Sequence, residues 1–341
     1  MKTVKSFVKY LISLGIAGLL LWLVFKDLNL HEVLDRLKTA DYRWAYISII
    51  MALTSHYLRA FRWTLMLKPM GFPVKTPRAF LSLMSGYLAN LGLPRMGEIT
   101  RCIILKKTDG IPLPGSFGSV ILERIIDLIM LGLALLLALV FQFSRIGSFF
   151  TGLLFRNRHI PVDSLIGWVM LGIVFLGGLV ILGWMFRGKI TGNSFFRKIR
   201  PVIGELINGL LSIRNVENKP LFYLCTLLIW VLYYLMAYIM VFSFPSTSGL
   251  SPMAGLVILV AGSLGMTVPV QGGIGTYHVF VSSVLVLYGI GHEDSVLYAT
   301  LMHTAQTLFV VISGGICILI SLLISNKKNK NVSGTKQDPV T

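Results

Sequence analysis

Residues 83–127 read LMSGYLANLGLPRMGEITRCIILKKTDGIPLPGSFGSVILERIID, and this stretch decides how the chain folds. An apolar run from Leu81 to Leu93 stops at Pro94-Arg95-Met96-Gly97-Glu98, and an amphipathic run from Ile99 to Leu105 follows. The first run has about 13 residues, whereas a helix that crosses a bilayer needs about 20. Non-helical backbone is tolerated at membrane depth only where protein or water satisfies it. We therefore expect a re-entrant helical hairpin that is broken at Pro94.

The composition indicates a polytopic membrane protein. Hydrophobic residues make up 55% of the 341 residues and charged residues 13%, with a mean hydropathy of +0.77, whereas a soluble domain carries about 25% charged residues. The net charge of +17 does not indicate a nucleic-acid partner, because the lysines and arginines lie between apolar segments. It fits a membrane surface rich in anionic lipid. Cys102, Cys225 and Cys317 follow no motif spacing, so we expect neither a disulfide framework nor a metal site.

Apolar segments of spanning length recur along the chain, and all of them are expected to be α-helical. We predict about six full spans and two re-entrant hairpins. The spans are residues 10–25, 44–67, 120–143, 165–186, 221–244 and 296–324. Two amphipathic segments, residues 26–43 and 199–213, are expected to lie on the membrane surface, and residues 145–164 are expected to form a loop.

The positive charges orient these spans. If the two hairpins do not cross the membrane, most basic segments lie on the same side of it. That side is expected to be cytoplasmic. The chain is therefore predicted to be a multi-pass protein of the cytoplasmic membrane with both termini inside. We expect one transmembrane domain over residues 1–325 and a disordered, lysine-rich tail over residues 326–341.

A second broken segment resembles the first. The apolar run Met253–Val268 stops at Pro269-Val270-Gln271-Gly272-Gly273-Ile274-Gly275, and a further run follows. Residues 90–97 can be aligned with residues 263–272. In the spans that follow the two breaks, Glu123 then aligns with His303. On the predicted topology the hairpins enter from opposite sides, which makes an inverted repeat of the kind found in transporters. The alternative is that proline and glycine breaks recur by chance.

Charged residues beside the first break are candidates for a binding site, because intramembrane charge is costly. Arg59 and Arg62 share a helix face and either snorkel to headgroups or bind a lipid phosphate. Arg95, Glu98 and Arg101 follow the break at helical spacing. There Glu98 is expected to orient the arginines, by pairing with Arg95 or Arg101, and the arginines to meet phosphate at a half-helix N-terminus.

The acidic residues of the next span leave two readings open. Glu123 and Asp127 share a face and would repel unless a cation lies between them, whereas Arg124 points elsewhere and could reach an acid of a neighbouring helix. The pair either holds a proton or a basic headgroup, or belongs to a buried ion-pair network that locks the hairpin to the span. Glycosidase-type chemistry is not expected, because nothing around the pair resembles a sugar-binding domain.

Polar residues of the second half are weaker candidates. Gln271, Gly272 and Gly273 lack the lysine and the strand of a phosphate loop, so they are expected to allow close helix approach or an unwound backbone. His303 is either packed and hydrogen-bonded or couples transport to protons. The aromatic residues between Trp230 and Tyr238 are expected to pack or to face lipid, or to form a groove for acyl chains.

Several of these residues, taken in order, resemble the lysylphosphatidylglycerol synthase transmembrane region, a flippase-like family. The residues are Arg59-Ala60-Phe61-Arg62-Trp63, Asn90 to Pro94, Arg95-Met96-Gly97-Glu98, Arg101, Glu123-Arg124, Asp127, and Pro269 with Gly272-Gly273-Ile274-Gly275. Fused members of this family add a soluble aminoacyl-transferase domain, for which residues 1–341 leave no room. The resemblance implies the lipid-translocating half and not the synthase, and it does not carry over a substrate.

The resulting functional hypothesis is lipid translocation without catalysis and without a cofactor. The partners would be a phospholipid or another amphipathic lipid, with a lipid-modifying enzyme as a possible second partner. The headgroup would contact a polar cleft lined by Arg59, Arg62, Asn90, Arg95, Glu98, Arg101, Glu123, Arg124, Asp127, Gln271, Gly272 and Gly273. Without an ATP motif, transport would be downhill or coupled to ions. The alternatives are a scaffold that delivers lipid to a partner enzyme and a membrane-embedded transferase.

Overall fold

The computed structural model describes residues 35–154 and 211–334, together with positions 15, 18, 19, 21, 22 and 204. All regular elements in these residues are helical, as expected for an all-α membrane protein. The first half comprises α3 (Tyr42–Leu67), η1 (Lys68–Met70), α4 (Thr76–Gly92), α5 (Gly97–Asp109) and α6 (Leu113–Leu154). The second half comprises η2 (Ser212–Asn215), α10 (Lys219–Ile239), η3 (Met240–Ser243), α11 (Pro252–Thr267), η4 (Gln271–Gly273), α12 (Thr276–Leu287) and α13 (His292–Gly334).

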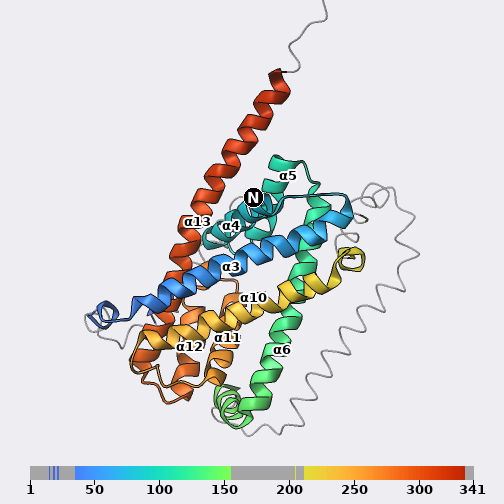
Figure 1. Ribbon diagram of the computed structural model, residues 1–341. Helices are drawn as coiled ribbons and strands as arrows, with labels where there is room; N and C mark the ends of the chain where they lie inside the picture. Colours follow the sequence, from blue (N-terminus) through green and yellow to red (C-terminus); the bar gives the residue numbers. More distant parts are fainter. Residues whose placement is uncertain are drawn as a thin grey trace, which may run out of the picture.

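Both halves repeat one order of elements: a long helix, a hairpin of two shorter helices, and another long helix (Figure 1). The halves also pack reciprocally, because α3 lies against α10, α4 against α13, and α11 against α6. A repeat related by a pseudo-two-fold axis produces such pairing. In Figure 1 the α4–α5 hairpin lies above the α11–α12 hairpin, in agreement with the inverted repeat expected from the two breaks.

Local sequence signals explain where several helices begin and end. The Asn218 side chain caps α10 by accepting a hydrogen bond from Leu221 N at 3.1 Å, and Ser251 caps α11 in the same way. Proline occupies the first turn of α4, α10 and α11, where no helical N–H is lost. Helix α5 ends at Gly110, whose φ of 83° is left-handed and suits glycine.

The broken hairpins meet at their tips. Arg95 in the first break has a φ of 62°, and its Nη2 donates to Thr267 O at the end of α11 over 3.2 Å. A Cβ at Gly272 in the second break would lie 2.6 Å from Leu91 Cδ2 of α4. Arg95 and Gly272 therefore bring the two Pro-Gly breaks into direct contact.

Buried apolar residues form two clusters that α3 joins. One cluster surrounds the end of α3 with α4, α5 and the start of α6; it includes Trp63, Leu83, Leu105 and Val120. The other surrounds α10 to α13 and takes in Ala45 and Ala52 from the start of α3.

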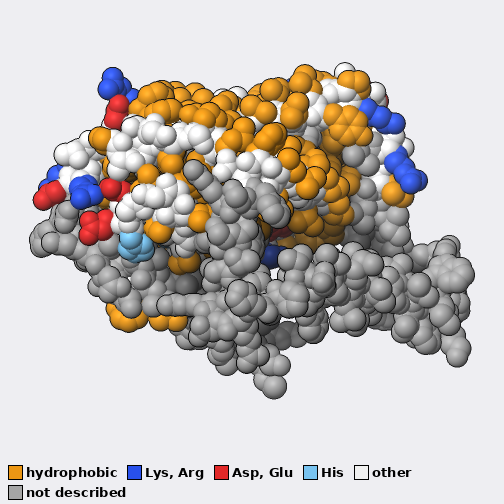
Figure 2. Space-filling model, turned by 90° about the horizontal axis from the view of Figure 1, so that it is seen from below, with side chains coloured by type: hydrophobic (Ala, Val, Ile, Leu, Met, Phe, Trp, Pro, Cys, Tyr) orange, Lys and Arg blue, Asp and Glu red, His pale blue; other side chains and the backbone are white. Residues whose placement is uncertain are grey.

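The outer surface suits a lipid bilayer. Three described helices are long and apolar enough to cross a membrane, over Leu113–Gln142, Lys219–Ser243 and His292–Asn326. The expected span 44–67 corresponds to α3, which has 26 residues but is not among these three. Figure 2 shows a broad apolar face with charged side chains gathered at its two ends.

Several expected boundaries differ from the structure. Helix α6 continues beyond a kink at Gln142 to Leu154, into residues expected to form a loop, because apolar residues such as Phe149 and Phe150 extend the pattern. Helix α13 continues to Gly334 and so includes residues 326–334 of the expected tail, whose disorder stays a prediction. The expected span 165–186 and most of the expected span 10–25 and of the segment 199–213 lie outside the described residues.

Candidate functional site

A cluster of buried charges joins α3 to α6. The Nε of Arg59 lies 2.5 Å from Glu123 Oε1, and its Nη2 pairs with Asp127 Oδ2. Its Nη1 donates to the Tyr233 hydroxyl of α10 over 2.8 Å. The cation expected between Glu123 and Asp127 is therefore Arg59, which is 5% exposed and does not snorkel to the surface.

Arg62 is fully buried in the same cluster. Its Nη2 donates to Asp127 Oδ1 at 3.2 Å and lies 3.9 Å from Glu123 Oε1. Its Nη1 donates to Thr226 Oγ1 of α10 at 3.1 Å. Snorkelling is therefore wrong for Arg62 as well, because its guanidinium binds acids and a hydroxyl inside the protein.

Arg101 reaches the cluster from α5 but makes no hydrogen bond there. Its Nη1 lies 2.9 Å from Glu123 Oε2, yet the two groups are not aligned for a hydrogen bond. Among the described residues, none of its three guanidinium nitrogens has a hydrogen-bond partner, although the side chain is only 3% exposed. The guanidinium lies 4.6 Å above the Trp63 ring, whose face attracts the cation but cannot replace a hydrogen-bond acceptor.

Arg124 is the exposed member of the cluster. Its Nη2 lies 3.2 Å from Glu123 Oε1 and 3.8 Å from Asp127 Oδ2, so the expectation that it reaches an acid of another helix is wrong. With Arg59, Arg62, Arg101 and Arg124, four cations face two carboxylates. The cluster is thus a buried ion-pair network with an excess of positive charge, and neither carboxylate is free to hold a basic headgroup.

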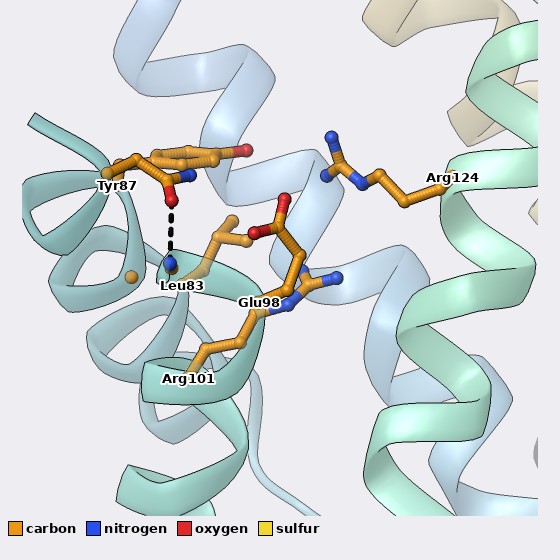
Figure 3. A pocket seen from close by; sticks show the side chains of 8 residues that line it. Leu83, Tyr87, Glu98, Arg101 and Arg124 are labelled. Atoms are coloured by element: carbon orange, nitrogen blue, oxygen red, sulfur yellow. Dashed lines mark hydrogen bonds between the residues drawn. The ribbon is translucent and has the colours of Figure 1, made fainter. Parts of the chain in front are cut away.

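A small pocket opens beside this network (Figure 3). It is lined by Leu83, Gly86, Tyr87, Asn90, Gly97, Glu98, Arg101 and Arg124. Glu98 and Arg101 extend from α5, and Arg124 extends toward them from α6. Its empty volume is about 190 Å³, much of it open to the outside, and the enclosed part is about the size of one water molecule.

Glu98 lies on the pocket wall without the partner expected for it. Within the described residues it forms no ion pair with Arg95 or Arg101, and its Oε2 is buried without a hydrogen-bond partner. Arg95 is not on the same helix face, because α5 begins only at Gly97 and Arg95 turns toward Thr267. The predicted Arg95–Glu98–Arg101 group therefore reduces to Glu98 and Arg101 in one pocket.

Asn90 closes the tip of the first hairpin. Its Oδ1 accepts a hydrogen bond from Gly97 N at 2.6 Å, drawn as the dashed line in Figure 3. This bond satisfies one of the free N–H groups at the start of α5, where Met96 offers no side-chain cap. Asn90 therefore fixes the turn that positions Glu98 and Arg101.

We predict that Asn90→Ala lowers the free energy of unfolding by about 1 kcal/mol, the usual cost of a lost helix cap. Asn90→Asp, which keeps the acceptor oxygen, is expected to retain most of this stability. Thermal unfolding of the purified variants in detergent measures the difference. Equal losses for both substitutions would contradict a capping role.

The candidates in the second break lie apart from this network. Gln271 and Gly273 are buried, and Gly272 and Gly273 have φ of 57° and 72°, so an unwound backbone, as expected, accounts for these glycines. His303 Nε2 lies 2.9 Å from Gly272 O, and its ring centroid lies 4.9 Å from that of His278. His303 is thus packed and hydrogen-bonded against the break.

Two partners on α10 and one on α3 were not predicted from the sequence. Tyr233 and Thr226 bind Arg59 and Arg62, so Tyr233 does more than pack or face lipid. Trp63 lies under Arg101 and donates from Nε1 to Ser119 Oγ at 2.9 Å. The spacing of Thr226 and Tyr233, two helical turns, was the available signal, because it places both polar groups on one face of α10.

Comparisons with known proteins point to one family. A family model described as the lysylphosphatidylglycerol synthase TM region matches residues 10–314. The glycosyltransferase AglD from Haloferax volcanii is 23% identical over 342 residues, which cover 91% of this chain and 54% of AglD. The UPF0104 membrane protein MJ1595 from Methanocaldococcus jannaschii is 25% identical over 122 residues, 35% of this chain and 36% of that protein. No solved structure matches.

The matched segments thus cover about half of the length of AglD and about a third of that of MJ1595. The ionic network, the pocket and both breaks lie within the part that the family model matches.

Proposed function

Since the chain belongs to the family of lysylphosphatidylglycerol synthase transmembrane regions, we propose that it moves an amphipathic lipid across the cytoplasmic membrane. The lipid is an anionic or aminoacylated phospholipid, or a polyprenyl lipid or glycolipid. The barrier to this movement is the desolvation of a charged headgroup in hydrocarbon. A protein lowers that barrier by offering polar partners along the route while the acyl chains remain in lipid.

One observation carries the proposal: the buried guanidinium of Arg101 lacks a hydrogen-bond partner among the described residues and lines an open pocket. The nearest acceptor, Glu123 Oε2 at 2.9 Å, forms an ion pair with this guanidinium but is not aligned with its N–H groups, and a phosphate oxygen is an acceptor that a guanidinium binds well. The excess positive charge of the network favours an anionic group at this point. Arg124, which is 43% exposed on the other wall, is placed to meet the same group.

The route would run along the contact between the two hairpins. A headgroup released from Arg124 and Arg101 would pass the tips, where Arg95 and the unwound glycines of the second break offer polar backbone and side-chain groups. We place the N- and C-termini in the cytoplasm, as the distribution of lysine and arginine indicates. On this view the chain itself is a transporter and not an enzyme.

A second candidate is a membrane part that holds a lipid for an enzyme without transporting it. The relative AglD, which carries the name of a glycosyltransferase and has about twice the matched length, favours this reading. In that case the pocket would bind lipid, and the lipid would stay in one leaflet.

Reconstitution tests the proposal through Arg124→Gln. Purified protein in liposomes with fluorescent anionic lipids and a quencher confined to the outer leaflet should show lipid movement. Arg124→Gln is expected to slow that movement at least tenfold, since a hydrogen bond to a charged group contributes about 1.5–3 kcal/mol. Because Arg124 is largely exposed, the variant should still fold.

Lys106→Gln is the matched control, because it removes one exposed positive charge from α5 outside the pocket. It is expected to leave the rate unchanged. Equal rates for Arg124→Gln and the parent would contradict the pocket as part of the route. Lipid binding without any movement between leaflets would support the holding role instead.

A further inference from the structure

The second break contains a titratable cluster that the proposed headgroup pocket does not use. His303 of α13 and His278 of α12 are 9% and 4% exposed, and their ring centroids are 4.9 Å apart. The ring of Tyr277, also buried, lies 5.2 Å from that of His303. In the sequence alignment of the two halves, His303 corresponds to Glu123 of the first.

The cluster is joined to the contact between the hairpin tips through Gly272. His303 Nε2 lies 2.9 Å from Gly272 O, and Gly272 is the point where Leu91 of the first hairpin touches the second break. With φ of 57° and Leu91 against it, Gly272 has little freedom to move independently. A change in the His303 ring is therefore transmitted directly to the tip contact.

The surroundings of the two imidazoles are apolar on most sides. Helix α12 contributes Tyr277 beside His278, and α13 contributes Tyr298, whose hydroxyl donates to Ala237 O. Helices α11 and η4 carry no ionisable side chain, and Arg95 of the first tip is directed at Thr267 O.

Where α13 meets α3 near this point, the described contacts are made by the uncharged Ser48. Ser48 contacts Met302 at 3.9 Å and accepts a hydrogen bond from Gln306 at 3.0 Å. Within the described residues no carboxylate pairs with His303. A proton on His303 would thus be an uncompensated charge as long as the tips remain closed.

Imidazole chemistry determines what a proton would do here. With Nε2–H donating to the Gly272 carbonyl, neutral His303 presents Nδ1 as the site that takes up a proton from water. The imidazolium then needs water or a polar partner, because an uncompensated charge in an apolar site is costly. Separation of the tips admits water and relieves this cost, so proton binding and tip opening favour each other.

We propose that His278 and His303 form a proton-binding site that loosens the contact between the two hairpin tips. A proton taken up from the aqueous phase on one side would be released on the other when the tips close again. The coupling of this proton to lipid movement rests on the proposed function, whereas proton-dependent opening of the tips does not. Histidine titrates in the range about pH 5 to 8, in which membranes maintain proton gradients.

Spin labels on the two tips test the opening without any lipid substrate. Leu93 and Thr267, both exposed, are replaced by labelled cysteines in a chain whose buried Cys102, Cys225 and Cys317 are alanines. The distance between the labels, measured by pulsed electron paramagnetic resonance in nanodiscs, is expected to increase between about pH 8 and pH 5.

His303→Gln, whose amide nitrogen can still donate to Gly272 O, should abolish the increase, and His278→Gln should weaken or abolish it. His56→Gln is the control, because His56 is a histidine between Tyr87 and Phe309, away from the second break. A label distance independent of pH in the parent would overturn the proposal. So would loss of the response in His56→Gln, or its persistence in His303→Gln.

Liposomes with an imposed pH gradient test the coupling separately. Parent protein is expected to move lipid several times faster with the gradient than without it, and His303→Gln should move lipid at one rate under both conditions. If the parent moves lipid at the same rate with and without the pH gradient, the proposed coupling to protons is wrong, but lipid translocation still stands. If no lipid moves under any condition, the proposed function fails, while the label distances still decide the proton site.

Discussion

Replacing Glu123 by glutamine is expected to lower the free energy of unfolding by about 3–5 kcal/mol, the cost of breaking a buried ion pair from one side. Glu123 is 1% exposed and pairs with Arg59, Arg101 and Arg124, with Arg62 at 3.9 Å. Without its charge, Arg59, Arg62 and Arg124 would share the single carboxylate of Asp127, and Arg101 would lose the carboxylate that it pairs with. Glutamine keeps the shape of the side chain, so the loss reports charge rather than packing. Detergent samples with an unfolding titration measure it.

Arg124→Gln provides the comparison, because it removes a charge from the same network at a partly exposed position. Its cost should stay below about 1 kcal/mol, as is usual for exposed ion pairs. A Glu123→Gln variant as stable as Arg124→Gln would mean that water or another group compensates the arginines. In that case the excess positive charge would no longer support an anion site.

The hairpins were predictable because backbone chemistry alone specifies them. Apolar runs too short to span a bilayer, each ended by proline and glycine, predicted both breaks, and the structure places these at residues 93–96 and 268–275. The ends of α6 and α13 were not predictable in this way. No proline or glycine signal marks a stop after Phe143 or Ile324, and helix continues where nothing prevents it.

The ionic network was predictable in part. The spacing of Glu123 and Asp127 required a cation between them, but only the packing of α3 against α6 identifies that cation as Arg59. The three-residue spacing of Arg95, Glu98 and Arg101 wrongly placed Arg95 on the same helix face as the other two. Helical periodicity applies only within a helix, and α5 starts two residues after Arg95. The missing hydrogen bond between Arg101 and Glu123 depends on angles in three dimensions, which no sequence pattern encodes.

Gly97→Ala is expected to cost about 3 kcal/mol and to displace α5. A Cβ at Gly97 would lie 2.2 Å from Gly86 O of α4 and 2.6 Å from Asn90 Nδ2. The nearest obstacle is backbone, which cannot rotate away as a side chain can, so the two helices of the hairpin would have to separate. Overpacking usually lowers the free energy of unfolding by about 1–3 kcal/mol, and a clash with backbone is expected at the upper end of this range.

Gly92→Ala is the matched control, because Gly92 ends α4 in the same hairpin and nothing lies within 4 Å of its added Cβ. Alanine favours helix over glycine by up to about 1 kcal/mol, so this variant should be as stable as the parent or slightly more stable. Thermal unfolding in detergent distinguishes the two. Similar midpoints for both variants would show that α4 and α5 are farther apart than this packing requires.

The same pair of variants connects the hairpin to the pocket. Gly86 and Gly97 line the pocket together with Glu98 and Arg101, so separation of α4 from α5 moves both charged side chains away from Arg124. Gly97→Ala should therefore slow lipid movement in liposomes even where folded protein is recovered, whereas Gly92→Ala should not. Normal transport by a destabilised Gly97→Ala variant would mean that the headgroup does not pass between α5 and α6.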